Sequence, residues 1–148
     1  MIQYAPIRIR PKRSSQAQRE VRRNTPLRKA RTCYGHLAGV AGVALMEELL
    51  GREWLKEEPV PVSGNRARYA LTTKGRQAME ELGVEVYMAA KSTGNFAFGC
   101  LDWTEPGLHL GGSLGRAVTA CLSDRGFMGR TEGKREVTLD GSPRSWLT

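Results

Sequence analysis

The sequence lacks the features of membrane and secreted proteins. No apolar run approaches the about 20 residues that a membrane-spanning helix needs, and no secretory signal opens the chain. Cysteine is also scarce: Cys33, Cys100 and Cys121 are an odd number without the spacing of a disulfide framework. We therefore expect a cytoplasmic protein with reduced thiols and no membrane contact.

Catalytic motifs are missing as well. Asp102, Glu105 and His109 could form an acid/base cluster, but no nucleophile elbow or metallohydrolase motif accompanies them. The glycine-rich run at 111–115 lacks the Gly-Lys-Ser/Thr ending of a phosphate-binding loop. We expect a protein that is not an enzyme.

Acidic side chains are few at the start of the chain. Residues 1 to 32 contain ten Lys and Arg side chains against the single acid Glu20, while the whole chain carries a formal charge of +8, so the rest is nearly neutral. Such a basic segment attracts polyanions, nucleic acid first, through phosphate neutralisation and counterion release. The alternative is a solvated leader without a partner. Pro6 and Pro11 break helices, and we predict a basic, disordered arm over residues 1–25.

One stretch of the sequence occurs twice. The segment from His36 to Leu55 matches the segment from His109 to Met128, and the shared positions include Leu37 with Leu110, Gly39 with Gly112, Gly42 with Gly115 and Leu49 with Leu122. A repeat of this length indicates one supersecondary unit used twice, each copy needing a partner to bury its apolar face.

The first copy predicts a buried helix followed by a hairpin. The helix is expected over residues 36–50, with Gly39 and Gly42 kept small by a closely packed backbone or ring. Alternating runs at 53–62 and 66–71, joined by a Ser/Gly/Asn turn, predict a β-hairpin. A helix capped by Thr72 or Thr73 follows over 75–82, which completes a winged-helix pattern.

The flanking segments and the second copy follow the same logic. Thr25 and Pro26 open a helix that is expected to run through Tyr34. The second copy predicts an amphipathic helix with an apolar stripe from Leu110 to Cys121, a tighter hairpin and a final helical turn at Ser142. The expected fold is α+β: a basic arm (1–25), a first winged-helix-like repeat (26–83), a connector (84–99) and a second repeat (100–148).

Two cysteine-containing phrases resemble a known family. Ala30-Arg-Thr-Cys-Tyr-Gly-His-Leu-Ala-Gly39 and Cys100-Leu-Asp-Trp-Thr-Glu105, the latter followed by His109-Leu-Gly-Gly, resemble the C-terminal half of ArsR-type winged helix-turn-helix transcriptional regulators. The resemblance covers about residues 26 to 148, and Leu71-Thr-Thr-Lys-Gly-Arg76 fits it, whereas 139–144 has drifted. It implies the effector-sensing and dimerisation portion of a regulator, with a small effector and a homodimer.

The sequence departs from that family in two places. Gly35 stands where the family usually has aspartate, which removes a polar side chain at this point. The family also carries an N-terminal winged helix that reads the operator, and this chain has only a basic leader there. DNA binding therefore does not follow from the resemblance alone.

Four side chains are candidates for metal or thiol sensing. Cys33 with His36, and Cys100 with His109, place one thiol and one imidazole near the head of each repeat. If the copies pack with pseudo-twofold symmetry, the four could converge on Zn²⁺. Redox sensing by the thiols is a second interpretation. The alternative is structural: the cysteines pack as small apolar groups and the histidines hydrogen-bond nearby turns.

Two further groups of residues are singled out. Tyr34, Trp54 and Trp103 are candidates for a small-molecule pocket, although large aromatics more often fill a core. Exposed cations of the arm and of the two hairpins are candidates for contacts to DNA phosphates, which position a protein without reading sequence: Arg22, Arg23, Arg28, Lys29, Arg66, Arg68, Lys134 and Arg135.

Overall fold

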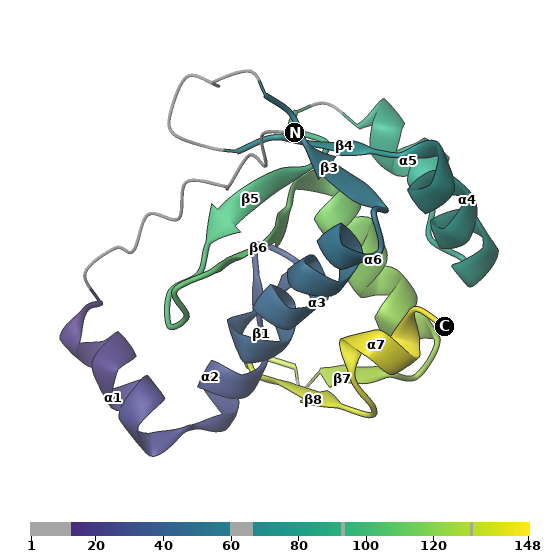
Figure 1. Ribbon diagram of the computed structural model, residues 1–148. Helices are drawn as coiled ribbons and strands as arrows, with labels where there is room; N and C mark the ends of the chain where they lie inside the picture. The colour runs from purple at the N-terminus through teal and green to yellow at the C-terminus, as the bar shows by residue number, and fades with distance from the viewer. Residues whose placement is uncertain (1–12, 60–66, 93, 131) are drawn as a thin grey trace.

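The computed structural model describes residues 13–59, 67–92, 94–130 and 132–148, and its fold is α+β, as predicted (Figure 1). Each repeat consists of a hairpin, a long helix, a second hairpin and a closing helix. The first contains β1 (Arg31–Cys33), β2 (His36–Ala38), α3 (Gly39–Gly51), β3 (Leu55–Glu57), β4 (Tyr69–Leu71) and α4 (Thr73–Leu82). The second contains β5 (Phe98–Leu101), β6 (Leu108–Gly111), α6 (Gly112–Asp124), β7 (Met128–Arg130), β8 (Val137–Leu139) and α7 (Pro143–Trp146).

Three shorter helices complete the described chain. They are α1 (Ser15–Arg23), α2 (Pro26–Lys29) and α5 (Val86–Lys91), and the last lies in the predicted connector. The predicted hairpins at 53–71 and 127–139 are confirmed as the antiparallel pairs β3–β4 and β7–β8, and the turn residues 63–65 lie outside the described residues. Within the described part of the chain, no helix is long and apolar enough to cross a membrane.

Both long helices begin later than the sequence predicts, α3 three residues after His36 and α6 two residues after Leu110. His36 and Leu37 lie in β2, and the helix starts only at Gly39, whose φ of +79° turns the chain sharply out of the strand. Gly112 repeats this conformation with φ of +84° at the start of α6. The helical spacing of apolar residues continues back through Leu37, so the pattern conceals the strand. Leu37 and its repeat partner Leu110 still occupy equivalent buried positions, exposed by 2% and 3%.

The basic segment also differs from the prediction. Part of the arm predicted to be disordered is the helix α1, which is capped by the Ser14 hydroxyl at its start and by the left-handed Asn24 at its end. The arm up to residue 12 lies outside the described residues. Thr25 caps α2 as predicted, but this helix ends at Lys29, because Arg31 begins a strand that pairs with β2.

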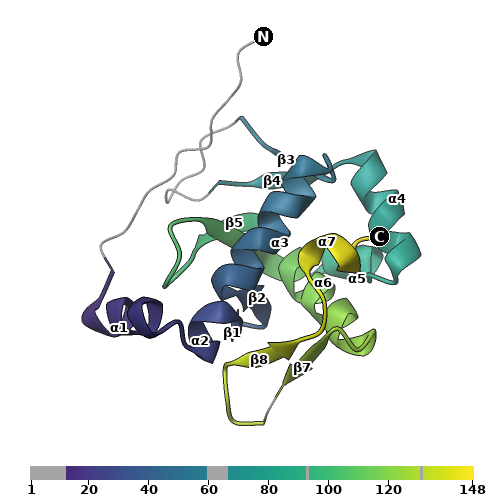
Figure 2. The ribbon, with the colours of Figure 1, turned by 60° about the horizontal axis from the view of Figure 1, so that its bottom comes forward.

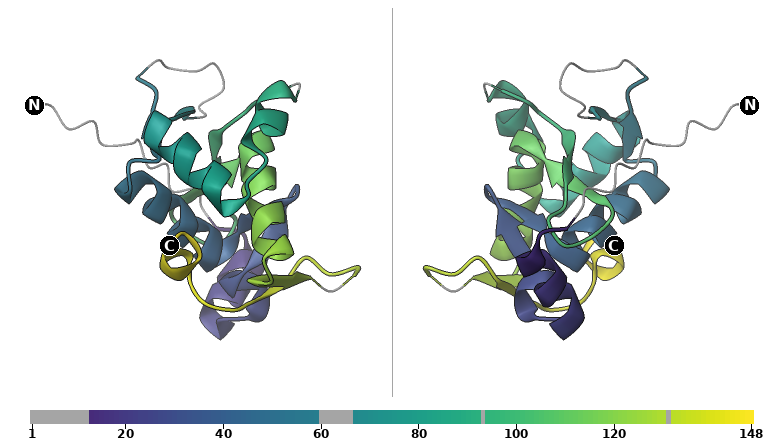
Figure 3. Two further views of the ribbon diagram at one scale, coloured as in Figure 1. Left: turned by 90° about the vertical axis from the view of Figure 1, so that its right-hand side faces the viewer. Right: turned by 90° about the vertical axis from the view of Figure 1, so that its left-hand side faces the viewer.

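Each long helix packs against the hairpin of the other repeat. Helix α3 lies against β6, and α6 lies against β2, so the two copies interlock (Figures 2 and 3). Helix α6 is amphipathic, as predicted: Arg116, Ala120 and Asp124 are exposed along one face, and the opposite side packs against β2 and α5. One hydrophobic core contains residues of both repeats, including Leu37, Leu49, Leu110 and Trp146. The shared core fixes the first hairpins of the two copies against each other.

Candidate metal centre

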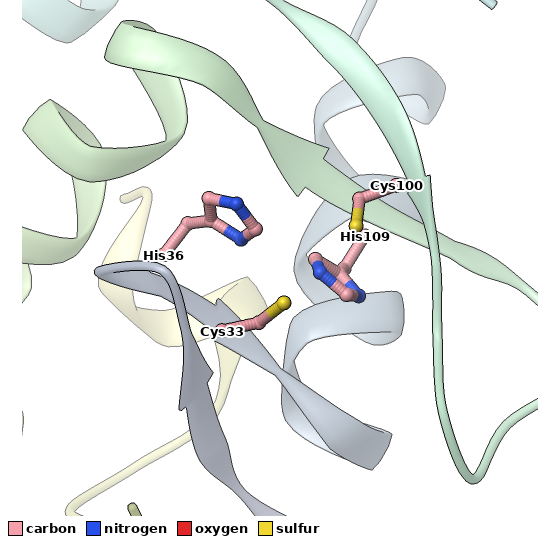
Figure 4. A group of neighbouring side chains, drawn as sticks. All are labelled: Cys33, His36, Cys100 and His109. Carbon is pink, nitrogen blue, oxygen red and sulfur yellow. The ribbon is translucent and has the colours of Figure 1, made fainter. Parts of the chain in front are cut away.

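Four soft donor groups meet where the two repeats face each other. Cys33, His36, Cys100 and His109 each offer one sulfur or nitrogen, and these four atoms all lie within 4.8 Å of one another. Their side chains point toward a common centre (Figure 4). The two histidines are buried, and the two cysteines are half-buried. The convergence proposed from the repeat is therefore present in the structure.

The hairpins explain why these residues meet. Cys33 faces His36 across β1 and β2, and Cys100 faces His109 across β5 and β6, so each hairpin presents one thiol and one imidazole from neighbouring positions. The turn between Cys33 and His36 consists of Tyr34 and Gly35, with φ of 49° and 88°. Positive φ at both positions is typical of the tight type I′ hairpin turn, and glycine adopts it without steric cost.

Two ring nitrogens in this cluster have unused hydrogen-bonding capacity. Among the described residues, His36 Nδ1 and His109 Nε2 are buried side-chain atoms without a hydrogen-bond partner. The two rings lie 5.0 Å apart between centroids. An unsatisfied buried polar atom costs about 1–3 kcal/mol. Two of them in one small cluster argue against purely structural histidines and fit nitrogen donors that await a ligand.

The buried carboxylate of Asp102 contacts one of the two histidines, His109. Asp102 Oδ2 lies 2.9 Å from His109 Nδ1, and Asp102 Oδ1 accepts a hydrogen bond of 2.8 Å from Arg31. Both partners of the Arg31–Asp102 ion pair are almost fully buried, with side chains exposed by 1% and 0%. Asp102 is thus a part of the site that the sequence suggested only as a member of an acid/base cluster.

The same packing shifts the proton affinities of the cluster. The hydrogen bond from Cys100, followed by the His109 imidazole, lowers the pKa of Cys33 to about 4. Burial, followed by the nearby His109, lowers the pKa of His36 to about 4. Burial opposes protonation of His109, but the hydrogen bond and charge of Asp102 and the interactions with Cys33 together outweigh burial and raise the pKa of His109. At neutral pH the site therefore favours the thiolate form of Cys33 and the neutral form of His36, which are the forms that bind metal.

The cluster fits a tetrahedral zinc site. At Zn–S and Zn–N bonds of about 2.3 and 2.0 Å, tetrahedral donor atoms lie roughly 3.3–3.8 Å apart. The four donor atoms lie within 4.8 Å of one another, so their separations exceed the upper end of this range by at most about 1 Å. Small side-chain rotations can close this difference. Two thiolates would neutralise the charge of Zn²⁺, whereas the oxygen donors preferred by Ca²⁺ and Mg²⁺ are not among the four.

The chain is similar in sequence to a curated bacterial protein. A curated protein of Bacillus subtilis (strain 168), named uncharacterized HTH-type transcriptional regulator YdfF, is 28% identical over 136 residues. The aligned part is 92% of this chain but 57% of that protein, so the chain spans less than two thirds of the relative's length. No family model matches the chain, and no solved structure matches it.

The candidates for phosphate contact separate into two groups. The larger group lies at one end of the molecule, where α2 adjoins β8 (Figure 1). Most of its members are exposed: Arg22, Arg23, Lys29, Lys134 and Arg135. Arg28, by contrast, is paired with Glu105 through its Nε at 3.0 Å. Arg68 lies apart: it is exposed and forms an isolated β-bridge with Phe98. Arg66 lies outside the described residues.

The three pocket candidates have different surroundings. Tyr34 is 90% exposed at the tip of the β1–β2 turn, and Trp54 is buried in the core. Trp103 is half-buried beneath the Arg31 guanidinium, 5.2 Å from ring centroid to Cζ. The hollows beside α3 are lined by other residues, including Val43 and Glu47. Cys121 packs in the core, as predicted.

Proposed function

We propose that this chain is the effector-sensing portion of a transcriptional regulator of the ArsR-like winged-helix type, and that its effector is a thiophilic metal ion of the zinc class. The convergence of Cys33, His36, Cys100 and His109 around two unpartnered buried nitrogens supports the metal. The similarity to a protein named as an HTH-type transcriptional regulator supports the regulatory role.

The donor set favours sensing over catalysis. Catalytic zinc sites keep one position open for water or substrate, whereas four protein ligands close the tetrahedron. Here the four ligands come in pairs from β1–β2 and β5–β6, so one ion would tie the two repeats together. Metal binding would then stabilise the arrangement of the whole core, which is a suitable signal for a regulator.

Metal binding is tested on the purified full chain. We expect one equivalent of zinc, and after exchange with Co²⁺ a visible spectrum typical of tetrahedral coordination with a thiolate charge-transfer band. Cys33→Ser and Cys100→Ser should each abolish both signals. Cys121→Ala is the matched control, because this thiol lies in the core and donates to the Leu82 carbonyl. Equal loss of metal from the Cys121 variant, or no metal in the wild type, would refute the proposal.

Thiol oxidation is the second candidate for the same site. The lowered pKa of Cys33 and its hydrogen bond with Cys100 favour a reactive thiolate next to a resolving thiol. Hydrogen peroxide would convert the two thiols to one disulfide and be reduced to two waters. Mass spectrometry of the metal-free protein distinguishes the two functions, since a sensor of this kind should form the Cys33–Cys100 disulfide at low peroxide while Cys121 stays reduced.

We also propose that the cationic end formed by α1, α2 and the β7–β8 hairpin contacts DNA phosphates. Two segments distant in sequence meet there, since Val137 N donates to Ala30 O and Thr32 N donates to Arg135 O. The hairpin that carries the exposed Lys134 and Arg135 thus adjoins the segment that follows α2 and its exposed Lys29. Contacts of this kind give affinity without sequence specificity.

Fluorescence anisotropy with labelled duplex DNA tests the phosphate contacts. Replacing Arg22 and Arg23 by glutamate should weaken binding and lower the salt slope by about one for each phosphate that the variant no longer neutralises. The control replaces Lys74 and Arg76 of α4, which lies away from α1 in Figure 1, by glutamate. Equal effects of the two double variants would show that net charge alone, and not this end of the molecule, governs binding.

A further inference from the structure

One buried carboxylate joins the two halves of the candidate metal centre. Asp102 lies in the loop between β5 and β6, and its Oδ2 is 2.9 Å from His109 Nδ1 and accepts a 2.8 Å hydrogen bond from the backbone N of Gly39. Its Oδ1 accepts from Arg31 Nη2 at 2.8 Å and from Thr104 N at 3.0 Å. The carboxylate therefore contacts a metal-ligand candidate of one repeat and the backbone of the other.

We propose that Asp102 is the positioning residue of the metal site: it fixes the proton of His109 on Nδ1 and thereby directs the Nε2 lone pair to the metal. This inference rests on the proposed function. A neutral imidazole carries its proton on one nitrogen, and the hydrogen bond made by that nitrogen decides which one remains free to bind metal. Because Asp102 accepts from Nδ1, the free nitrogen is Nε2, the buried atom that lacks a partner among the described residues.

The carboxylate also sets the separation of the two hairpins. Arg31 lies in β1, two residues before Cys33, and Gly39 directly follows β2, which begins with His36. By binding both Arg31 and Gly39, Asp102 holds the hairpin of Cys33 and His36 at a fixed distance from His109. Metal sites lose affinity when their ligands are free to move, and a clamp of this kind reduces that freedom.

Arg31 balances the charge of the carboxylate. Its guanidinium donates to Asp102, to the Thr104 hydroxyl at 3.0 Å and to the Leu27 carbonyl at 3.2 Å, and its side chain is 1% exposed. The negative charge of Asp102 is thus paired before any metal binds. The two thiols then remain available to supply the two negative charges that a divalent metal requires.

Asparagine cannot replace aspartate in this role. An amide has one acceptor oxygen and one NH₂ group that only donates, whereas Asp102 uses both of its oxygens as acceptors, one toward Arg31 and one toward Gly39 and His109. In Asp102→Asn, the NH₂ group would face the donating guanidinium of Arg31 in one orientation of the amide and the His109 ring in the other. If it faces the ring, His109 must carry its proton on Nε2, which removes the metal donor.

The test compares Asp102→Asn with Glu105→Gln in the full chain. Glu105 lies in the same loop and pairs with Arg28, but it makes no hydrogen bond to His109 that the structure shows within its described residues. Chelator competition should show that Asp102→Asn binds zinc about 10–100-fold more weakly, whereas Glu105→Gln keeps the wild-type affinity. Long-range ¹H–¹⁵N spectra of the zinc-loaded wild type should show His109 bound through Nε2 and protonated on Nδ1.

Asp102→Glu keeps the experiment informative if the asparagine variant fails to fold. It retains the charge and both acceptor oxygens, so we expect intermediate zinc affinity with the His109 proton still on Nδ1. Wild-type affinity in Asp102→Asn, or an equal loss in Glu105→Gln, would overturn the role of Asp102 while leaving zinc binding intact. Absence of zinc binding in the wild type would instead refute the proposed function.

Discussion

The most direct test of the interlocked repeats is a methyl group added to α3. At Gly42, a Cβ would overlap the Leu37 carbonyl oxygen, lie 2.7 Å from the Leu37 carbonyl carbon and lie 3.3 Å from the Cβ of His109. At Gly51, near the end of the same helix, a Cβ would meet nothing within 4 Å. Gly42→Ala and Gly51→Ala therefore make the same chemical change in crowded and open surroundings.

The magnitude follows from two opposing terms. Alanine is favoured over glycine inside a helix by up to about 1 kcal/mol, and this gain is available to both variants. Overpacking costs about 1–3 kcal/mol, and this cost arises only at Gly42, where the nearest atoms belong to backbone. The difference in unfolding free energy between the two variants should thus be about 1–3 kcal/mol, or roughly 3–9 °C in Tm for a chain of this size.

Urea and thermal unfolding of both metal-free variants measure this difference. We expect Gly51→Ala to be as stable as the wild type or slightly more stable, and Gly42→Ala to be less stable than Gly51→Ala. In Gly42→Ala the added methyl group should also displace His109, so zinc binding should be weaker in this variant and unchanged in Gly51→Ala. If the two variants are equally stable, the close approach of α3 to the β5–β6 hairpin, and the packing argument with it, is wrong.

Three further predictions concern the charged groups of the site. Because the Cys33 pKa is lowered to about 4, iodoacetamide should modify Cys33 in the metal-free protein at almost the same rate at pH 6 and pH 8. Cys121, whose pKa is raised by burial, should react slowly at both pH values. Peptide mass spectrometry measures the two rates, and an equal pH dependence for Cys33 and Cys121 would contradict the prediction. Burial opposes ionisation of Asp102, but His109 and Arg31 outweigh it and lower its pKa, so its stabilising effect is present above the ordinary value of about 4 and lost as the pH falls below it. The stability advantage of wild type over Asp102→Asn in urea unfolding should accordingly shrink below pH 4, and a constant difference would refute the assignment. Arg28→Ala, which breaks the ion pair with Glu105, should speed hydrogen exchange in α1 and α2 by up to about fivefold, and unchanged exchange there would show that this pair does not hold the segment.

The sequence predicted the repeat and its donor residues because both depend on local signals. Identical spacing of histidines, glycines and leucines in the two copies is visible without coordinates, and so are the caps Thr25 and Thr72 and the alternation of the β3–β4 and β7–β8 hairpins. The expectation that Gly42 stays small is confirmed by the Leu37 backbone and the His109 Cβ beside it. Local propensity and duplication were sufficient for these features.

Two of the wrong local predictions have a reason that the sequence pattern itself shows. The strands β2 and β6, which lead directly into the long helices, are only three and four residues long. Their apolar side chains continue the helical spacing of the helix that follows. Only the positive φ of Gly39 and Gly112 separates strand from helix, and glycine in a sequence does not reveal its φ. Helix α1 was missed because it buries a single residue, Ala17, so it shows no apolar face to recognise.

By itself, the sequence determined that this chain contains two copies of one α+β unit, each carrying one thiol and one imidazole. Only the tertiary structure decided that the copies interlock, so that Cys33 and His36 meet Cys100 and His109 and Asp102 reaches across to Arg31 and Gly39. The physical reason is that these contacts join residues more than 60 positions apart, and their geometry depends on how the helices bury their faces in a shared core.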